Sequence, residues 1–519
     1  MNFSYFQKRS QDKQDPTEEN IPVSSDLHTN IDALKKEFGD CADLFIRELN
    51  LGTQVDIAIV HIDSISDAKT INSSIVQPLL TLGANKQFDN STNTSDILYM
   101  LKNHTLAVCV LKATNNWNEV ISAIVSGDTV ILLQHSKEAL IANSSHIESR
   151  SVEESTTQVL IRGPKDSFTE AIRTNISLVR TRIRNSKLRV DSIKLGEVTQ
   201  TDVAIMYIEG IIKPSTLKDL RKRLQRIKID SILESGYIES FIQDSKFSMF
   251  PTILNTERPD VVAANLLEGR FAIFVNGTPF VLIAPATFMQ FFQTPEDYYQ
   301  RYDIGSFLRL LRIAAFFVSL LVPALYVAAA THHQGMIPTV LVLSIASQRE
   351  GVPLPVIVEV IFMELAFEFL REAGIRMPRA VGQTASIVGA LILGQAAVQA
   401  GFVSAATIII VSITAISSFA IPNYNLAITA RLLRFVLMIM AAYIGLYGIL
   451  LIMLALGLHL CKLNSFGIPY LTPLAPFIAE EQKDTFFRFP LHFMFKRPIT
   501  AKETSKQRLS TRDGDTDAT

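Results

Sequence analysis

The 519-residue sequence has few cysteines, little net charge and none of the common catalytic motifs. Cys41, Cys109 and Cys461 form no CxxC pair and have no histidine at zinc-finger spacing, which argues against a metal or disulfide framework and predicts three buried thiols. The formal net charge of −1 gives no reason to expect nucleic-acid binding. Because phosphate-loop, dinucleotide-fingerprint, HExxH and GxSxG patterns are absent, we expect no enzyme activity, no metal and no cofactor.

Lysine and aspartate are missing altogether between Ile313 and Leu458. A membrane-spanning helix needs about 20 mostly apolar residues, and several runs in this stretch have that length. The sequence therefore predicts an all-α polytopic membrane domain over residues 307–480, with about five or six membrane segments including a broken helix. The four longest apolar runs are Ile313–Ala330, Val381–Ala400, Val403–Ile421 and Phe435–Leu458.

The more polar residues before the first apolar run contain two pairs of similar segments. Asp56–Asp63 and Asp202–Glu209 are acidic-led, β-branched runs of strand length. Ser126–Leu133 and Glu268–Val275 resemble each other and follow the first pair at nearly the same distance. We therefore predict an α/β soluble N-terminal region made of two similar small subdomains.

Composition gives the remaining boundaries. The first residues have no apolar signal-peptide core, and their polar composition predicts a disordered tail. The predicted division is a disordered tail (1–30), subdomain 1 (31–165), a connecting basic helix (166–190), subdomain 2 with the pre-membrane linker (191–306), the transmembrane domain (307–480) and a polar C-terminal tail (481–519).

The predicted basic helix carries many cations, including Arg173, Arg180, Arg182 and Arg189. These could attract phosphate or an anionic membrane surface. The alternative, which we favour, is the solvated face of a helix whose isoleucines are buried.

The apolar pattern breaks between Gly335 and Arg371. Met336–Ser347 is too short to span a membrane, and a glycine and two prolines separate it from a second apolar stretch, Val356–Leu370. The second stretch contains Glu359, Glu364 and Glu368.

Two interpretations of these carboxylates stay open. Glu364 and Glu368 share a helix face, which fits a helix lying in the membrane interface. Alternatively, carboxylates from several subunits line a hydrated cavity or a cation pore. Glu359 points about 140° away from Glu364 and would face lipid in the interfacial arrangement. We therefore name Glu359, Glu364 and Glu368 as candidate pore or gating residues.

Small residues and charges outside this helix give further expectations. Gly382, Gly389 and Gly394 are candidate helix-packing residues, either within one chain or in an oligomer. The Tyr298–Arg312 segment fits either a membrane interface or an amphipathic linker. If Phe435–Leu458 crosses once, Lys462 lies on the outer side, and the side of the C-terminus stays open.

Several motifs together resemble the A subunit of GerA-type spore germinant receptors, over about residues 40–484. These motifs are Arg162–Ile183, Thr256–Asp260, Pro295–Tyr299, Arg371–Pro378, Val388–Val398 and Phe466–Tyr470.

The resemblance implies a multi-pass protein of the spore inner membrane, with its N-terminal domain on the cytoplasmic (core) side. It also implies a transporter-like B subunit that binds the nutrient, a lipoprotein C subunit, the lipid bilayer and self-association as a pentamer. The oligomer would be a ligand-gated channel that releases monovalent cations. Two alternatives stay open: a sporulation-operon homologue that amplifies germination, and a non-conducting scaffold for the other subunits.

Overall fold

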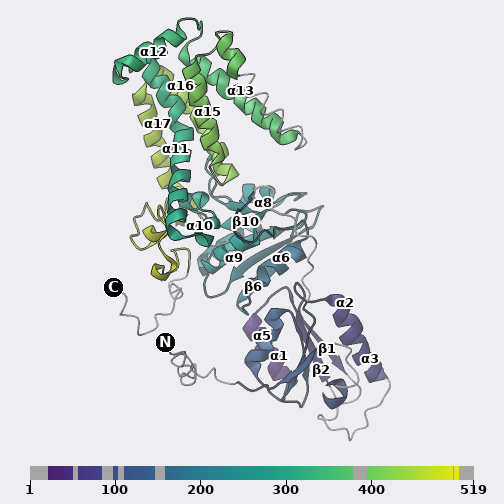
Figure 1. Cartoon of the computed structure of the whole chain (residues 1–519). Helices are drawn as coiled ribbons and strands as arrows, with labels where there is room; N and C mark the ends of the chain where they lie inside the picture. The colour runs from purple at the N-terminus through teal and green to yellow at the C-terminus, as the bar shows by residue number, and fades with distance from the viewer. Residues whose placement is uncertain are drawn as a thin grey trace, which may run out of the picture.

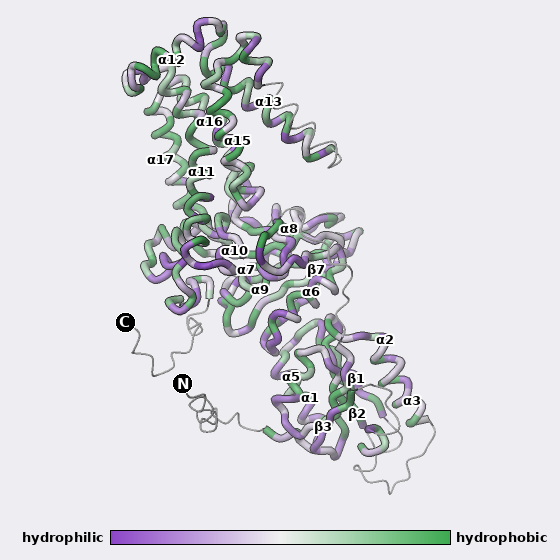
Figure 2. The backbone as a smooth tube through the Cα atoms, in the orientation of Figure 1, coloured by the Kyte–Doolittle hydropathy of each residue, from purple (hydrophilic) through white to green (hydrophobic). Residues whose placement is uncertain are grey.

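The computed structural model describes residues 21–50, 56–84, 98–102, 110–145, 158–377, 394–494 and 496–501. Two sheet-containing units follow one another, and a helical bundle stands on the second unit (Figure 1). The two units have mixed hydropathy, whereas the bundle is mostly hydrophobic (Figure 2). This arrangement confirms the predicted α/β N-terminal region followed by a helical region.

The first unit is a five-stranded antiparallel sheet in the order β1-β2-β4-β5-β3. Its helix α1 begins where the Asp26 side chain accepts a hydrogen bond from the Thr29 amide. The elements of this unit are α1 (Leu27–Phe38), β1 (Leu44–Asn50), β2 (Asp56–Ile62), α2 (Ala68–Thr70), η2 (Ile71–Val76), α3 (Gln77–Ala84), β3 (Leu111–Thr114), α5 (Trp117–Ser126), β4 (Thr129–Leu133) and β5 (Ala139–Ala142).

The second unit is again a five-stranded antiparallel sheet, in the order β6-β7-β9-β10-β8. Its central strand β9 is buried along its whole length, which explains the apolar run in the sequence. The elements are α6 (Ile172–Arg180), β6 (Leu188–Leu195), β7 (Thr201–Ile208), α7 (Pro214–Leu224), α8 (Ser235–Ile242), β8 (Leu254–Thr256), α9 (Pro259–Leu267), β9 (Phe271–Val275) and β10 (Val281–Ala284).

The two units have the same strand order, as the matched sequence segments predicted. The paired segments become β2 and β7, and β4 and β9, which occupy equivalent places in the two sheets. Helix α6 precedes β6 as α1 precedes β1. The predicted connecting helix over 166–190 is therefore corrected: the helix has nine residues, and it is the first element of the second unit.

Two cations of this basic segment, Arg180 and Arg189, do not belong to a solvated face, whereas Arg173, Arg184 and Lys187 are exposed. Arg180 is buried and holds Asp43 of the first unit by two hydrogen bonds, of 2.6 and 2.7 Å. Arg189 is also buried; it pairs with Glu209 and donates to the Glu37 carbonyl at 3.0 Å. Buried and paired in this way, Arg180 and Arg189 fix the first unit against the second.

The cysteines differ from the prediction of three buried thiols. Cys41 is buried at the joint between the two units, and its thiol lies 3.1 Å from the Arg180 guanidinium. Burial, together with the nearby Asp43 carboxylate, raises the pKa of the Cys41 thiol to about 11. Cys461 is exposed, which corrects the prediction for that thiol, and Cys109 lies outside the described residues.

Among the described residues of the helical region, two helices are long and apolar enough to cross a membrane, α11 (Tyr302–Thr331) and α16 (Tyr424–Ile444), and two shorter apolar helices are α15 (Ala405–Phe419) and α17 (Leu446–Lys462). The count of five or six crossings stays a prediction. The elements after β10 are η4 (Phe288–Phe292), α10 (Glu296–Tyr299), α11 (Tyr302–Thr331), η5 (Gln334–Met336), α12 (Thr339–Arg349), α13 (Val356–Arg376), α15 (Ala405–Phe419), α16 (Tyr424–Ile444), α17 (Leu446–Lys462), β11 (Asn464–Ser465), β12 (Ile468–Pro469), η6 (Glu481–Asp484) and η7 (Leu491–Phe493).

The predicted break between two helices is present, since α12 ends at Arg349 and α13 begins at Val356. The predicted single helix over Phe435–Leu458 is wrong. Gly445 has a positive φ of 71°, which ends α16, and α17 begins at the next residue.

Contacts with the second unit give the direction of these two helices. The Thr429 hydroxyl, near the start of α16, donates to the Met249 carbonyl. His459, near the end of α17, lies 3.0 Å from the Ser248 hydroxyl. The chain therefore runs away from the second unit along α16 and returns along α17. Lys462 lies at the same end of the bundle as the soluble region, which corrects its predicted position on the outer side.

The turn at Gly445 gives a first prediction. A Cβ atom there would lie 2.6 Å from the His333 imidazole, in a backbone conformation that costs an alanine about 1–2 kcal/mol. We expect Gly445→Ala to lower the free energy of unfolding in detergent by about 1–3 kcal/mol. Gly457→Ala in α17 is the matched control, because a Cβ added there would meet nothing within 4 Å and no loss is expected. Equal stability of the two variants would contradict this account of the turn.

The core of the second unit continues into the bundle. Phe288 packs edge-on against Phe316 of α11 at 6.0 Å between ring centroids and against Tyr470 at 5.9 Å. Residues of β7, β9, α11 and α16 belong to the same buried apolar cluster. A close-packed core transmits displacement, so a movement of the bundle is mechanically linked to the second unit.

Candidate functional site

Five charged side chains from α13 and α16 meet inside the helical bundle, and we call them the arginine–glutamate cluster: Glu364, Glu368, Arg371, Arg431 and Arg434. Arg434 lies 3.1 Å from a carboxylate oxygen of Glu364 and 3.1 Å from one of Glu368. Arg431 contacts Glu368 at 2.8 Å, and Arg371 contacts it at 3.4 Å. The cluster therefore ties α13 to α16 by ion pairs.

The cluster is deeply buried at its centre and has more positive than negative charge. The side chains of Arg434 and Glu364 are 0% and 1% exposed, and that of Glu368 is 22% exposed. Two carboxylates and three guanidiniums give the cluster a formal charge of +1. A cation would be repelled by this net charge, so the cluster is suited to holding helices together rather than to coordinating a passing cation.

Glu359 occupies a separate site at the start of α13. One carboxylate oxygen pairs with Arg349 of α12 at 3.2 Å, and the other accepts hydrogen bonds of 3.1 Å from the Ser404 amide and the Thr407 hydroxyl. The Glu359 side chain is fully buried. It therefore joins α12, α13 and the N-terminus of α15 instead of facing lipid.

A second buried ion network, the junction network, connects the base of α11 to both the soluble region and the C-terminal segment. Asp297 is 1% exposed and lies between two arginines of α11, pairing with Arg309 at 3.2 Å and with Arg312. Arg309 also contacts the Asp484 carboxylate at 2.9 Å. Two carboxylates, Asp297 and Asp484, thus balance two guanidiniums at the point where the soluble region becomes the bundle.

Tyrosines of α10 complete this network. Tyr298 donates to Asp484 at 2.7 Å, and its burial raises its pKa well above the usual range, with Asp484 adding to the effect. Tyr299 donates to Asp260 at 2.7 Å. For Tyr298 and Tyr299 the structure therefore favours packing against protein over a position at the lipid interface, whereas Tyr302 and Phe307 of the same segment are 47% and 65% exposed.

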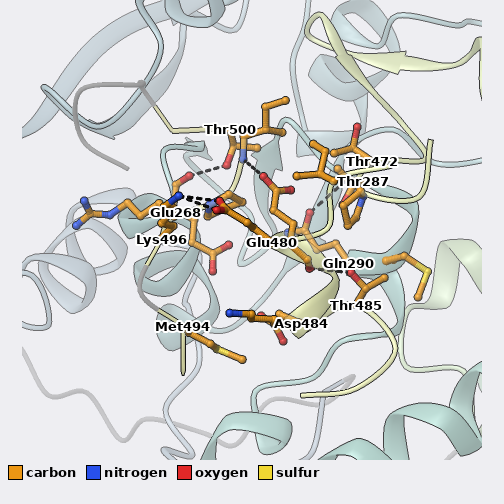
Figure 3. A pocket seen from close by; sticks show the side chains of 18 of the residues that line it. Glu268, Thr287, Gln290, Thr472, Glu480, Asp484, Thr485, Met494, Lys496 and Thr500 are labelled. Atoms are coloured by element: carbon orange, nitrogen blue, oxygen red, sulfur yellow. Dashed lines mark hydrogen bonds and ion pairs between the residues drawn. The ribbon is translucent and has the colours of Figure 1, made fainter. Parts of the chain in front are cut away.

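A cavity of about 320 Å³ lies beside the junction network, between the second unit and the C-terminal segment (Figure 3). Lys496 bridges to Glu480 at 2.7 Å, and Thr500 donates to the Glu268 carbonyl at 2.6 Å. Arg497 also donates to the Leu267 carbonyl at 2.9 Å, so residues 496–501 of the predicted polar tail pack against the second unit. Within the described ranges, no group of three or more histidine, cysteine, aspartate or glutamate side chains could hold a metal ion.

Of the three candidate packing glycines, the structure describes Gly394. Gly382 and Gly389 lie outside the described residues. Gly394 lines an apolar groove of about 260 Å³ between α13 and α15, where a Cβ would lie 4.0 Å from Ile408. That distance is ordinary van der Waals contact, so α15 does not approach Gly394 closely enough to require a glycine there.

The sequence did not reveal the partners of the glutamates. Arg431 and Arg434 both lie within α16. Arg431 and Arg434 are three residues apart, and Glu364 and Glu368 are four residues apart, so each pair lies on one face of its helix. These complementary charged faces are the sequence signal that could have predicted contact between α13 and α16. Asp297 and Asp484 carried no such signal, because 187 positions of chain separate them.

One carboxyl group in the soluble region titrates near neutral pH. Glu239 lies on α8, and burial raises its pKa to about 7, with the Glu234 carboxylate adding to the effect. The folded protein therefore holds this proton more tightly than the unfolded chain, and stability is lost as pH rises from about 4.5 through 7.

We expect this single group to lower the free energy of unfolding by up to about 3 kcal/mol between pH 5 and pH 8, relative to Glu239→Gln. The measurement is thermal unfolding of both full-length proteins in detergent across that range. Other groups titrate equally in the two proteins, so the difference between the curves isolates Glu239. Parallel curves would show that its pKa is not raised.

Comparison with known proteins places this architecture among spore proteins. Residues 32–500 match the family model described as Bacillus/Clostridium GerA spore germination protein. Spore germination protein KA of Bacillus subtilis (strain 168) is 49% identical over 497 residues, which cover 95% of this chain and 90% of the relative. Spore germination protein GerLA of Bacillus cereus is 41% identical, covering 92% of this chain and 96% of the relative.

A further relative is an uncharacterized membrane protein, YfkQ, of Bacillus subtilis (strain 168), which is 44% identical over 95% of this chain and 94% of its own length. Among solved structures, the N-terminal domain of the A subunit of the Bacillus megaterium spore germinant receptor GerK3 is 38% identical. The match covers 52% of this chain and 98% of the solved chain, with a TM-score of 0.40.

Proposed function

Because the chain belongs to the GerA family of spore germination proteins, we propose that it is the A subunit of a germinant receptor and the element that conducts monovalent cations when a nutrient is sensed. Its partners would be a transporter-like B subunit, which binds the nutrient, and a lipoprotein C subunit. The proposal places the helical bundle in the spore inner membrane and the two sheet units on the core side.

The hydropathy of the bundle supports this placement. Helices α11 and α16 are long and apolar enough to span a bilayer. Helix α17 returns to the soluble region, so the described C-terminal segment lies on the same side as the N-terminal units. The arginines at the base of α11 then lie on the core side, consistent with the positive-inside tendency.

The exposed surface of α12 supports self-association into an oligomer, with a pentamer as the expected size. Along the described chain, none of the residues of α12 is buried. Val340 and Leu343 are 80% and 66% exposed. The α12–α13 break places non-helical backbone at the outer end of the bundle, which a membrane tolerates only where protein or water surrounds it. Neighbouring copies would supply that protein contact, and a central path would supply the water.

The arginine–glutamate cluster carries the proposal. Buried ion pairs hold α13, the second half of the broken segment, against α16. The segment can therefore act as a two-state element, held in one position while the ion pairs are formed and released when they separate. We propose that this position is the closed state. A nutrient bound to the B subunit could open the path only by favouring the state in which the ion pairs are rearranged.

The test is potassium release from spores in which this chain is the sole A subunit, triggered by a panel of amino acids and sugars. Glu359→Gln removes the charge that joins α12, α13 and α15, so we expect altered release kinetics at a normal protein level. Glu350→Gln is the matched control, because Glu350 is exposed next to the same break. Unchanged kinetics for Glu359→Gln would remove this residue from the gating element.

A scaffold that anchors the other subunits without conducting is the second candidate. It is favoured by the pairing of Glu359, Glu364 and Glu368 with arginines of the same chain. A scaffold predicts that glutamate variants lose receptor assembly or nothing, whereas a conducting subunit predicts altered ion release from an assembled receptor. Measuring assembly and potassium release in the same spores separates the two.

A further inference from the structure

Exposed aromatic and apolar side chains occur on α8 and in the segment that follows it in the second unit. Phe247 is 98% exposed, and Phe241, Tyr237 and Met249 are 45%, 40% and 51% exposed. Isolated apolar side chains are common on protein surfaces. Here Tyr237 and Phe241 lie one turn apart on α8, and Phe247 and Met249 lie two residues apart in the segment that follows, so four exposed apolar side chains come from one short stretch of chain. We call residues 237–249 the aromatic edge.

The aromatic edge is held at the level where the bundle helices meet the soluble region. Ser248 contacts His459, near the end of α17, and Met249 contacts Thr429, near the start of α16. In Figure 1, α8 lies on the side of the second unit that faces the bundle. The exposed side chains are therefore placed beside the ends of two apolar helices.

The charges next to the aromatic edge are those that an anionic surface attracts. Lys246 is exposed directly before Phe247. Helix α7 packs against the edge through Arg223, which donates to the Ile242 carbonyl at 2.5 Å and pairs with Asp244 at 2.6 Å. Lys222, the neighbour of Arg223, is exposed. Asp244 of the edge is thus paired, while Lys246 of the edge and Lys222 of α7 are exposed. The edge contains one further carboxyl group, Glu239, which is half-buried.

We propose that the aromatic edge is a lipid-contact surface that inserts into the headgroup layer of an anionic bilayer, with Phe247 reaching the acyl boundary and Lys246 at the lipid phosphates. Aromatic side chains prefer this boundary, and a lysine near it gains from negative lipid charge. The surface would fix the second unit against the membrane beside the moving bundle. The inference rests on the proposed placement of the bundle in a membrane.

The experiment uses Phe247→Trp in the full-length chain, reconstituted in nanodiscs of zwitterionic lipid with or without phosphatidylglycerol. Quenching of the added indole by brominated acyl chains reports its contact with lipid. The native Trp117 is buried in the first unit and supplies a constant baseline. Phe317→Trp, at a 41% exposed position of α11, is the positive control, and Phe45→Trp, at a 52% exposed position of β1, is the negative control.

We expect Phe247→Trp to be quenched by brominated lipid several-fold more than Phe45→Trp, with stronger quenching in anionic discs and a smaller lipid dependence after Lys246→Glu. If Phe317→Trp is quenched but Phe247→Trp behaves like Phe45→Trp, the lipid-contact surface is refuted while the membrane placement stands. If Phe317→Trp is not quenched, the membrane placement itself fails. Protection of Phe247→Trp only when a partner subunit is added would assign the edge to a protein interface and overturn the proposal.

Discussion

Replacing Arg434 with methionine is expected to lower the free energy of unfolding by about 3–5 kcal/mol, because it removes the ion pair that Arg434 forms with the buried carboxylate of Glu364. Glu368 retains Arg431 and Arg371, so the loss is concentrated on Glu364. The effect is large because the side chains of Arg434 and Glu364 are almost completely buried. Water could reach the remaining carboxylate only if the contact between α13 and α16 opened. Unfolding in a mixed-micelle titration measures it.

The chain offers a matched control for this ion pair. Glu372 and Arg376 form a pair of 2.7 Å on the same helix, but their side chains are 61% and 78% exposed. Arg376→Met should change stability by less than about 1 kcal/mol, since exposed ion pairs contribute little. Adding Glu364→Gln to Arg434→Met should recover part of the loss, because the unpaired charge is removed. Equal effects of Arg434→Met and Arg376→Met would show that the cluster is not buried as described.

Replacing Asp297 with asparagine is the second large expected effect. The substitution keeps the size of the side chain but leaves Arg309 and Arg312 facing each other with no carboxylate between them. Arg309 retains its pair with Asp484, whereas Arg312 keeps only neutral partners, including Thr294 at 2.7 Å. We expect a loss of about 3–5 kcal/mol in the free energy of unfolding and separation of α11 from the soluble region.

Limited proteolysis of the full-length protein in detergent, monitored together with unfolding, measures both consequences. Asp303→Asn is the control, because Asp303 pairs with Arg301 in an exposed position, with side chains 49% and 76% exposed. Asp303→Asn should leave the proteolysis pattern unchanged. If Asp297→Asn gives the same pattern as the control, the junction network does not hold the base of α11.

The soluble fold was predictable because local signals repeat. The apolar runs that became β2 and β7 are buried on both faces, and a duplicated unit shows the same pattern twice. The position of α6 was not predictable from its cationic composition, because the partners of Arg180 and Arg189 come from distant parts of the chain. A cation that pairs across 137 residues has the same local pattern as one facing water.

In the helical region, hydropathy predicted the apolar segments but not how they are divided. Gly445 sits inside an uninterrupted apolar run, and only its left-handed conformation shows that the chain turns there. The acidic helix was found from Glu359, Glu364 and Glu368, whereas their pairing with arginines depends on which helices pack together. That packing is a property of tertiary structure, and a single sequence carries little information about it.

The claim that the arginine–glutamate cluster holds the closed state is tested most directly by potassium leakage from spores carrying Glu368→Gln, measured without any nutrient. Glu368 contacts three arginines, so its neutralisation changes the formal charge of the cluster from +1 to +2 and weakens the hold of α16 on α13. Glu372→Gln, one turn along the same helix, is the control. The account predicts nutrient-independent potassium release from assembled receptors with Glu368→Gln and none with Glu372→Gln; assembled Glu368→Gln receptors that stay closed and respond normally to nutrient would contradict it.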